Sequence, residues 1–334
     1  MGRWRVMLLA LGLDLLLGEP PARWHPVVWM GRLVERLERR APEGSPRRRL
    51  AYGAAAEAVC LGAALLPARL AERLLGGRRW LGDLALAAAL KPAFALRALF
   101  EPFRRVERAL VDGDLPGARR EVGHVVSRRV DDLDEERVAA AAVESLAENA
   151  CDSVVAPLLY YATLGLPGAY LYRAANTLDA MWGYRGRYEE LGKVPARVDD
   201  LLNLLPSRLA AAAVVATCRA VGCDQRRAWR VAARDSARTA SPNAGWPMSA
   251  VAGAVDLRLE KVGHYVLNPD GRSPTVADMA RARRVVAAAL APQVRHERAV
   301  DVPPLLGGGA PGLVLVGAAI EVAGNGRRQG EPQA

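Results

Sequence analysis

Lysine is scarce in this sequence. Only Lys91, Lys193 and Lys261 occur among the 46 basic residues, so the formal net charge of +10 comes almost entirely from arginine. None of the three lies in a glycine-rich phosphate loop, and the absence of GxxxxGK[ST] excludes a P-loop. GxSxG and HExxH are also absent, so no hydrolase elbow or zincin motif is present.

Aromatic residues are scarce too, at 5% of the chain. Nucleic-acid surfaces combine a basic stripe with stacking aromatics, and no such interleaving occurs here, so we expect no nucleic-acid partner. The cysteines form no CxxC pair and no zinc spacing, and we expect reduced thiols that pack as small apolar side chains. They are Cys60, Cys151, Cys218 and Cys223.

Hydrophobic residues make up 51% of the sequence, and its abundant Ala and Leu favour helix. The sequence predicts an all-α, multi-pass protein of the cell membrane, with about four to five transmembrane helices and polar helical loops. Arginines gather between apolar segments, especially over residues 32–49, as in cytoplasmic loops. The long apolar segments are 51–66, 81–100, 153–172, 201–218 and 305–320, of which 153–172 has 20 residues without a charge, about the length of a span.

The expected domain organisation is simple. We predict one helical membrane domain over residues 1–324, with polar helical insertions at about 101–148 and 219–300, and a disordered tail over 325–334. Within the first insertion, Asp114-Leu-Pro-Gly-Ala predicts a turn and a helix start. A second helix is expected over 131–147.

Three acidic residues precede the uncharged segment. Glu144, Glu148 and Asp152 are spaced i, i+4, i+8, which places them on one face of a helix. A central membrane carboxylate costs roughly 2.5–3.5 kcal/mol. We therefore expect these groups at the membrane edge, paired with arginine, or holding a divalent cation. The alternative is a solvated acidic helix end.

Two further polar stretches carry similar side chains. Arg173, Asn176 and Asp179 follow the apolar segment at i, i+3, i+6, and a loop with local hydrogen bonds is the alternative. Farther on, Asp199 and Asn203 are flanked by Arg197 and Arg208, and helix capping by Asp199 or Asp200 is the alternative. Oxygen-rich side chains of this kind suit Mg²⁺, whose shell substrate phosphates complete.

The remaining candidates lie near the N-terminus and at residues 241–254. His25 stands after Asp14 and Glu19, and either belongs to a recognition loop or has a structural role. "SPNAGWPMSAVAGA" sets a rigid turn followed by small residues. Backbone N–H groups at such a turn suit an anion, and a plain helix entrance is the alternative.

In this order, five stretches resemble the adenosylcobinamide-phosphate synthase family of cobalamin biosynthesis. The resemblance covers roughly residues 8–270, and the combination is specific where each stretch alone is weak. The stretches are "LDLLLGEPPARWHPVVWMGRL", "ESLAENACDSVVAPLLYY", "YRAANTLDAMWGYRGRYEELG", "ARVDDLLNLLPSRL" and "SPNAGWPMSAVAGAV".

The resemblance implies a multi-pass membrane enzyme that consumes ATP and requires Mg²⁺. Such an enzyme joins adenosylcobyric acid to (R)-1-aminopropan-2-ol phosphate, or to ethanolamine phosphate, through an amide bond. The sequence departs from the family pattern at Cys151 and Ser153, where Ser and Gly are frequent, and at Ala240, where many members carry His. The last change argues against an essential base at that position.

Carried onto this chain, the resemblance implies roles for its polar residues. Glu148 and Asp152 are expected to be catalytic and metal-binding, together with the metal ligands Asp179 and Asp200. Glu19 or His25 is expected to accept a proton from the incoming ammonium. The residues expected to bind substrate or its phosphate are Asn149, Arg173, Asn176, Arg197, Asn203, Arg208, Ser241, Asn243 and Trp246.

Two other classes share some of these features. Intramembrane Mg²⁺-dependent prenyl- or phosphotransferases place Asp-rich motifs at helix ends, but residues 148–152 match such a motif only in part. Transporters use membrane carboxylates as ion sites and show inverted repeats, which this sequence lacks. The sequence leaves the oligomeric state open.

Overall fold

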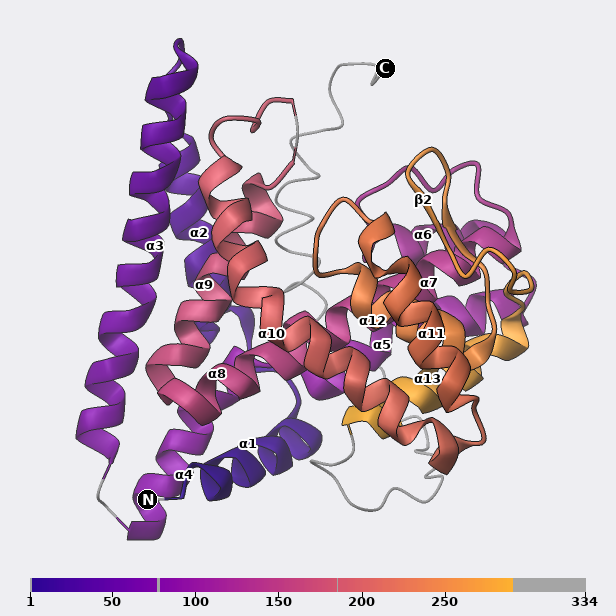
Figure 1. Ribbon diagram of the computed structural model, residues 1–334. Helices are drawn as coiled ribbons and strands as arrows, with labels where there is room; N and C mark the ends of the chain where they lie inside the picture. The colour runs from indigo at the N-terminus through magenta and orange to yellow at the C-terminus, as the bar shows by residue number, and fades with distance from the viewer. Residues whose placement is uncertain (1, 77–78, 185, 291–334) are drawn as a thin grey trace. The chain divides into compact units, whose positions relative to one another are not determined.

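The computed structural model describes residues 2–76, 79–184 and 186–290 (Figure 1). The described chain is almost entirely helical, with one two-stranded antiparallel sheet. This confirms the predicted helical class. The apolar segment 305–320, the tail 325–334 and the end of the second polar insertion, 291–300, lie outside the described residues.

The chain divides into two compact units, whose described parts are residues 2–95 with 156–203 and residues 96–155 with 204–290. In the first unit, α3 lies along α9, and an apolar cluster that includes Leu178 and Trp182 joins α2, α3 and α9. The elements of this unit are α1 (Arg3–Leu17), η1 (Ala22–Trp24), α2 (Pro26–Glu38), α3 (Pro46–Leu75), α4 (Arg79–Leu90), η2 (Lys91–Ala93), α8 (Ala156–Leu164), α9 (Leu166–Trp182) and the start of α10 (Lys193–Thr217).

In the second unit, α7 is the central helix. Every residue from Val138 to Ala147 is buried, because α5, α6, α12 and α13 all pack against α7. Both predicted polar insertions contribute to this unit. Its elements are α5 (Leu96–Val111), α6 (Leu115–Gly123), α7 (Glu135–Ala150), the π-helical η3 (Cys151–Val155), the remainder of α10, η4 (Cys218–Val221), α11 (Gln225–Asp235), η5 (Ser236–Arg238), α12 (Gly245–Val255), β1 (Leu259–Lys261), β2 (Tyr265–Leu267) and α13 (Val276–Leu290).

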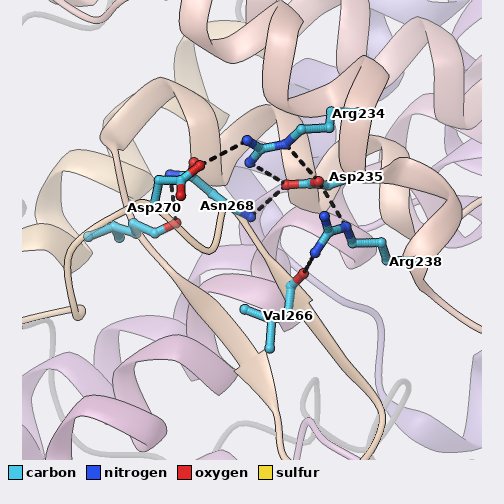
Figure 2. Close-up of polar contacts among 7 residues, drawn as sticks. Arg234, Asp235, Arg238, Val266, Asn268 and Asp270 are labelled. Atoms are coloured by element: carbon cyan, nitrogen blue, oxygen red, sulfur yellow. Dashed lines mark hydrogen bonds and ion pairs between the residues drawn. The ribbon is translucent and has the colours of Figure 1, made fainter.

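The β1–β2 hairpin is anchored by one buried carboxylate (Figure 2). Asp235 is fully buried and accepts hydrogen bonds from Arg234 at 2.9 Å and from the Asn268 backbone N–H at 2.8 Å, while Arg238 pairs with it at 2.9 Å. Arg238 also donates to the Val266 carbonyl at 3.2 Å. Because these bonds satisfy the buried charge, the carboxylate fixes the hairpin rather than destabilising the core.

Local sequence signals set several helix starts. Asp114 caps α6 by accepting from the Gly117 N–H at 2.8 Å, as the predicted turn requires. The helix expected over 131–147 is α7, which begins at Glu135 because Asp134 caps it, and which extends to Ala150. Cys60, Cys151 and Cys218 are buried, which confirms their predicted packing, and Cys223 is half-buried.

The uncharged segment 153–172 is not one spanning helix, contrary to the prediction. It is divided into η3, α8 and α9, with Gly165 between the two α-helices at φ +76°. Only glycine adopts that conformation readily, and the Leu166 N–H that follows is capped by Glu72 at 3.1 Å. Because η3 and α8 continue α7 without interruption up to Leu164, the uncharged segment is shared between that helix and α9.

Within the described residues, two helices are long and apolar enough to cross a membrane, Pro46–Leu75 and Lys193–Val221. Only 28% and 39% of their most apolar windows are buried, whereas a core helix of a soluble protein is mostly buried. This pair corresponds to the predicted segments 51–66 and 201–218. The expected total of four to five spans is not confirmed.

Candidate functional site

The N-terminal motif forms a buried ionic network in the first unit. Lys91 Nζ lies 3.0 Å from an Asp14 carboxylate oxygen and 2.7 Å from one of Glu19, whose other oxygen lies 3.0 Å from His25 Nε2. His25 Nδ1 accepts from the Val27 N–H at 3.2 Å and so caps α2. Both ring nitrogens of His25 are therefore engaged within the protein.

Electrostatics assign the protonation states of this pair. Burial lowers the pKa of His25, against the raising effect of its hydrogen bond to Glu19. Burial raises the pKa of Glu19, but the contacts with His25 and Lys91 outweigh it and leave that pKa lowered. The arrangement is a neutral imidazole that donates from Nε2 to an ionised Glu19.

Two of the predicted polar stretches meet in a network between α9 and the start of α10. Asp199 accepts from the side-chain amides of Asn176 at 3.3 Å and of Asn203 at 2.9 Å. The Asn203 carbonyl oxygen accepts from the Tyr172 hydroxyl at 3.0 Å, and the Asn176 oxygen from Arg173 at 3.4 Å. The Arg173 stretch is thus helical rather than a loop, and Asp199 is its partner rather than a helix cap.

The other predicted residues of the first unit border this network. Asp179 and Asp200 are half-buried and Arg197 is exposed. A Cβ on Gly183 would lie 2.2 Å from Asp179 Oδ1, so a glycine at 183 leaves room for that carboxylate.

In the second unit, Ser207 and Arg208 in the middle of α10 meet the Ser-Pro-Asn turn. Arg208 Nη1 donates to Asn243 Oδ1 at 2.8 Å and to Ser207 Oγ at 3.0 Å. Its guanidinium lies 5.2 Å from the Trp246 ring centroid, in cation–π contact. Ser241 Oγ accepts from the Asn243 N–H at 3.2 Å and so holds the turn. The structure therefore brings together four of the predicted phosphate-binding residues.

A glycine makes this turn possible. A Cβ on Gly245 would lie 2.0 Å from the Ser236 carbonyl oxygen, so no other residue fits without movement of the backbone. The turn thereby packs directly against η5, and α12 begins at Gly245. Close backbone approach is the reason for the glycine in this motif.

The acidic residues on α7 do not act as one cluster. Glu144 is buried and pairs with Arg128, and it accepts from the Tyr265 hydroxyl at 3.2 Å. Burial raises the pKa of Glu144, and Arg128 opposes that shift. Glu148 is exposed, and Asp152 lies in the π-helical η3, where the winding shifts it from the expected i, i+4, i+8 face. Asn149 is half-buried and donates to the Ser145 carbonyl at 2.8 Å.

The expected metal ligands belong to both units, Asp179 and Asp200 to the first and Glu148 and Asp152 to the second. Among the residues that the structure describes, no three His, Cys, Asp or Glu side chains gather so as to hold a metal ion. Mg²⁺ that arrives with a nucleotide needs only one or two carboxylates, because waters and phosphates fill its shell. The donors therefore fit nucleotide-borne Mg²⁺, and a single shared metal centre stays a prediction.

Sequence reasoning missed several partners. Lys91 pairs with Asp14 and Glu19, and its charge inside an apolar segment was the available signal. Arg128 and Tyr265 carried no signal in the sequence, because their role depends on Glu144, which α7 presents from another part of the chain.

The fold and the polar contacts together define the class of protein to which the chain belongs. The chain is a helical protein whose long helices expose leucine and whose inner faces carry arginine, amide and carboxylate groups. Residues 7–291 match the family described as CobD/Cbib protein, and the chain belongs to this family.

Relatives support the same assignment over most of their length. The "Cobalamin biosynthesis protein CobD" of Rhodobacter capsulatus is 43% identical over 83% of this chain and 90% of the relative. Proteins with the same description are 38% identical in Dehalococcoides mccartyi, over 80% and 87%, and 43% identical in Chromobacterium violaceum, over 83% and 90%. No solved structure matches the chain.

Proposed function

We propose that this protein acts in cobalamin biosynthesis as an ATP-dependent amide ligase of the cell membrane. It joins adenosylcobyric acid to (R)-1-aminopropan-2-ol phosphate, or to ethanolamine phosphate, and yields adenosylcobinamide phosphate. The observation that carries the proposal is the family match over residues 7–291, within which the five motifs fall. The names of the relatives support the pathway, and the reaction is our inference.

The chemistry requires an activated carboxylate, because a carboxylate anion resists attack by an amine. A carboxylate oxygen of the corrinoid attacks the γ-phosphorus of ATP, the bond to the bridging oxygen breaks, and ADP leaves. The amine nitrogen then attacks the carbonyl carbon, the C–N bond forms, and inorganic phosphate leaves with the carboxylate oxygen. The ammonium proton passes to a base or to water. When bound, Mg²⁺ would neutralise phosphate charge during the first step.

Arginines are the proposed phosphate ligands, since a guanidinium matches phosphate geometry. Arg208 is held by Ser207 and Asn243 and stacks on Trp246, so its orientation is fixed before a substrate arrives. Arg173 is buried beside the Asp199 network, and Arg197 is exposed. Glu19 remains the proposed proton acceptor of the N-terminal motif, with His25 orienting it by a hydrogen bond.

The test is product formation by purified protein in detergent or nanodiscs, given adenosylcobyric acid, aminopropanol phosphate, ATP and Mg²⁺. We expect ADP and amide product in equal amounts, which neither a prenyltransferase nor a transporter would give. With ¹⁸O in the corrinoid carboxylate, label should appear in inorganic phosphate. Absence of ATP consumption in step with the corrinoid would contradict the proposal.

The metal role is tested residue by residue. Asp152→Asn keeps the size of the side chain and removes its charge, so we expect at least a tenfold loss of turnover and a higher Mg²⁺ requirement. Asp132→Asn, an exposed change in the same unit, is the matched control. Near-normal turnover of folded Asp152→Asn would remove that residue from the metal role.

A further inference from the structure

We propose that exposed arginines at the end of α2 and the start of α3 form a surface that binds the headgroups of anionic phospholipids. This inference rests on the membrane location within the proposed function and is independent of the reaction. The arginine surface lies in the first unit and consists of Arg32, Arg36, Arg39, Arg40, Arg47 and Arg48.

The charges of these arginines are not neutralised from within the protein. All six are exposed, and among the residues that the structure describes no ion pair joins any of them to an acidic side chain. Residues 32–49 hold seven arginines against three glutamates. One of these glutamates, Glu38, already accepts from the Tyr188 hydroxyl at 2.6 Å and pairs with Arg187 at 3.1 Å. Positive charge therefore remains for an external anion.

The sequence of α2 places part of this surface on one side of the helix. Trp29, Arg32 and Arg36 are spaced i, i+3, i+7, which aligns them on one face. The other side carries Val27 and Val34, which are buried. The helix is therefore amphipathic, and its outer face combines an exposed indole with guanidinium groups.

Hydrogen bonds hold the start of α3 beside the end of α2. Tyr52, in the second turn of α3, donates from its hydroxyl to the Leu37 carbonyl at 2.8 Å. Ser45 caps α3 by accepting from the Arg48 N–H at 3.4 Å. The two helices also pack against each other (Figure 1). The arginines at the end of α2 and those at the start of α3 therefore belong to one surface.

The arginine surface lies at one end of a candidate membrane span. With 30 residues, α3 is about 45 Å long, which is about the thickness of a bilayer with its headgroup regions. Farther along α3, Val59 is 49% exposed and Leu66 is 66% exposed, as suits contact with lipid chains. When these side chains lie in the hydrocarbon core, Arg47 and Arg48 in the first turn lie at the level of the headgroups.

An anionic phospholipid is the partner that this position and this chemistry favour. A guanidinium matches phosphate oxygens through two parallel hydrogen bonds, and clusters of about four to eight basic residues beside a span attract anionic headgroups. Trp29 is 48% exposed, and indoles favour the same interfacial layer. A nucleotide needs a concave pocket, whereas this surface follows the exposed side of a helix.

Native mass spectrometry of the full-length protein in detergent micelles tests the surface. The protein is given phosphatidylglycerol and phosphatidylcholine in equal amounts, and the ratio of the bound lipids defines the preference. We expect the wild type to prefer phosphatidylglycerol by at least about 30-fold, because each basic residue near an anionic surface contributes about fivefold. Raising ammonium acetate from about 0.1 M to about 0.5 M should reduce that preference, since salt screens exposed charges.

Two double variants locate the effect. Arg36→Gln with Arg40→Gln at the end of α2, and Arg47→Gln with Arg48→Gln at the start of α3, should each lower the preference by about 10- to 30-fold. A full preference in both folded double variants would overturn the surface. If neither variant folds, the wild type decides, because a preference that salt does not change would refute an arginine-based surface.

The matched control is Arg104→Gln with Arg108→Gln, an exposed i, i+4 pair on α5 in the second unit. It should keep the full preference, and an equal loss there would show a diffuse effect of net charge. A short DNA duplex serves as a second probe. If the wild type binds it through the same arginines and shows no lipid preference, the surface binds nucleic acid and the proposal fails.

The outcomes also separate this inference from the proposed function. If the wild type forms amide product without a preference for phosphatidylglycerol, the surface fails and the ligase assignment stands. If the preference is present and depends on the arginines while no product forms, the surface stands and the proposed reaction fails.

Discussion

Single residues in this protein derive their roles from partners that hold them in one orientation. Arg208 is the clearest case, because its guanidinium donates to Ser207 and Asn243 and stacks on Trp246. Lysine offers one compact ammonium and cannot reproduce a planar fork. The conformation of this side chain is therefore as important as its charge.

We expect Arg208→Lys to lower kcat/KM for the phosphate-bearing substrate by about 10- to 100-fold, since a charge-assisted contact of roughly 1.5–3 kcal/mol is impaired. Steady-state kinetics with the amide product as readout measure the effect. Arg230→Lys, an exposed change on α11, is the control. Equal kinetics for the two variants would show that Arg208 does not contact substrate.

At the scale of elements, the first turn of α13 contains Asp278, a carboxylate whose pKa lies well below its usual value. Burial alone would raise the pKa of Asp278, but hydrogen bonds from Arg272 and Thr275 lower it to about 2. Thr275 donates from its N–H at 3.0 Å and from its hydroxyl at 2.7 Å. A charged acceptor at a helix N-terminus is also favourable for the helix dipole.

This lowered pKa predicts how stability depends on pH. Asp278 stabilises the folded state fully above its unfolded pKa of about 3.9, and that contribution is lost as the pH falls toward 2. We expect Asp278→Asn to lower the melting temperature at pH 7 and the gap to the wild type to narrow below pH 4. Thermal unfolding in detergent between pH 7 and pH 2.5 measures it. A gap that does not change with pH would contradict the assigned ionisation.

The break within residues 153–172 also belongs to this scale. Periodicity and charge predict a single span, yet Gly165 adopts a left-handed conformation and Glu72 caps the helix that follows. A Cβ on Gly165 would lie 2.2 Å from that Glu72 carboxylate. The signal for a break was the pair Gly165 and Pro167, but the capping partner comes from a distant helix.

At the scale of the whole molecule, part of α10 reverses the pattern of a helix on a soluble protein. Over residues 199–207 its buried side chains include the polar Asp199, Asn203 and Ser207, whereas Leu201 is 67% exposed and Leu205 58% exposed. Exposed leucines on α1, α3 and α4 extend this feature to other helices. Large apolar surfaces in contact with water are unfavourable, so these faces suit lipid.

We therefore expect the protein to remain in the membrane fraction after alkaline carbonate washing and to require detergent for extraction. The arginine-rich segment 32–49 should face the cytoplasm. A cysteine in place of exposed Glu43 should react with an impermeant thiol reagent in inside-out vesicles and not in intact cells. Release by carbonate would contradict membrane integration, and labelling of intact cells would invert the orientation.

Local structure followed from the sequence itself. The helical content, the turn and helix start at Asp114, and the family motifs depend on residues within a few positions of one another, so local hydrogen bonds determine them. The chemistry that we propose also starts from the sequence, because residue types limit which ligands a chain can bind.

Only the tertiary structure decided which charges meet. Lys91 pairs with Asp14 and Glu19, and Tyr265 donates to Glu144. Each contact joins residues that are more than 70 positions apart. Burying a charge is unfavourable unless an oppositely charged or hydrogen-bonding partner lies beside it. The sequence does not specify that partner, because it comes from a distant part of the chain. The packing of the helices determines which residue it is.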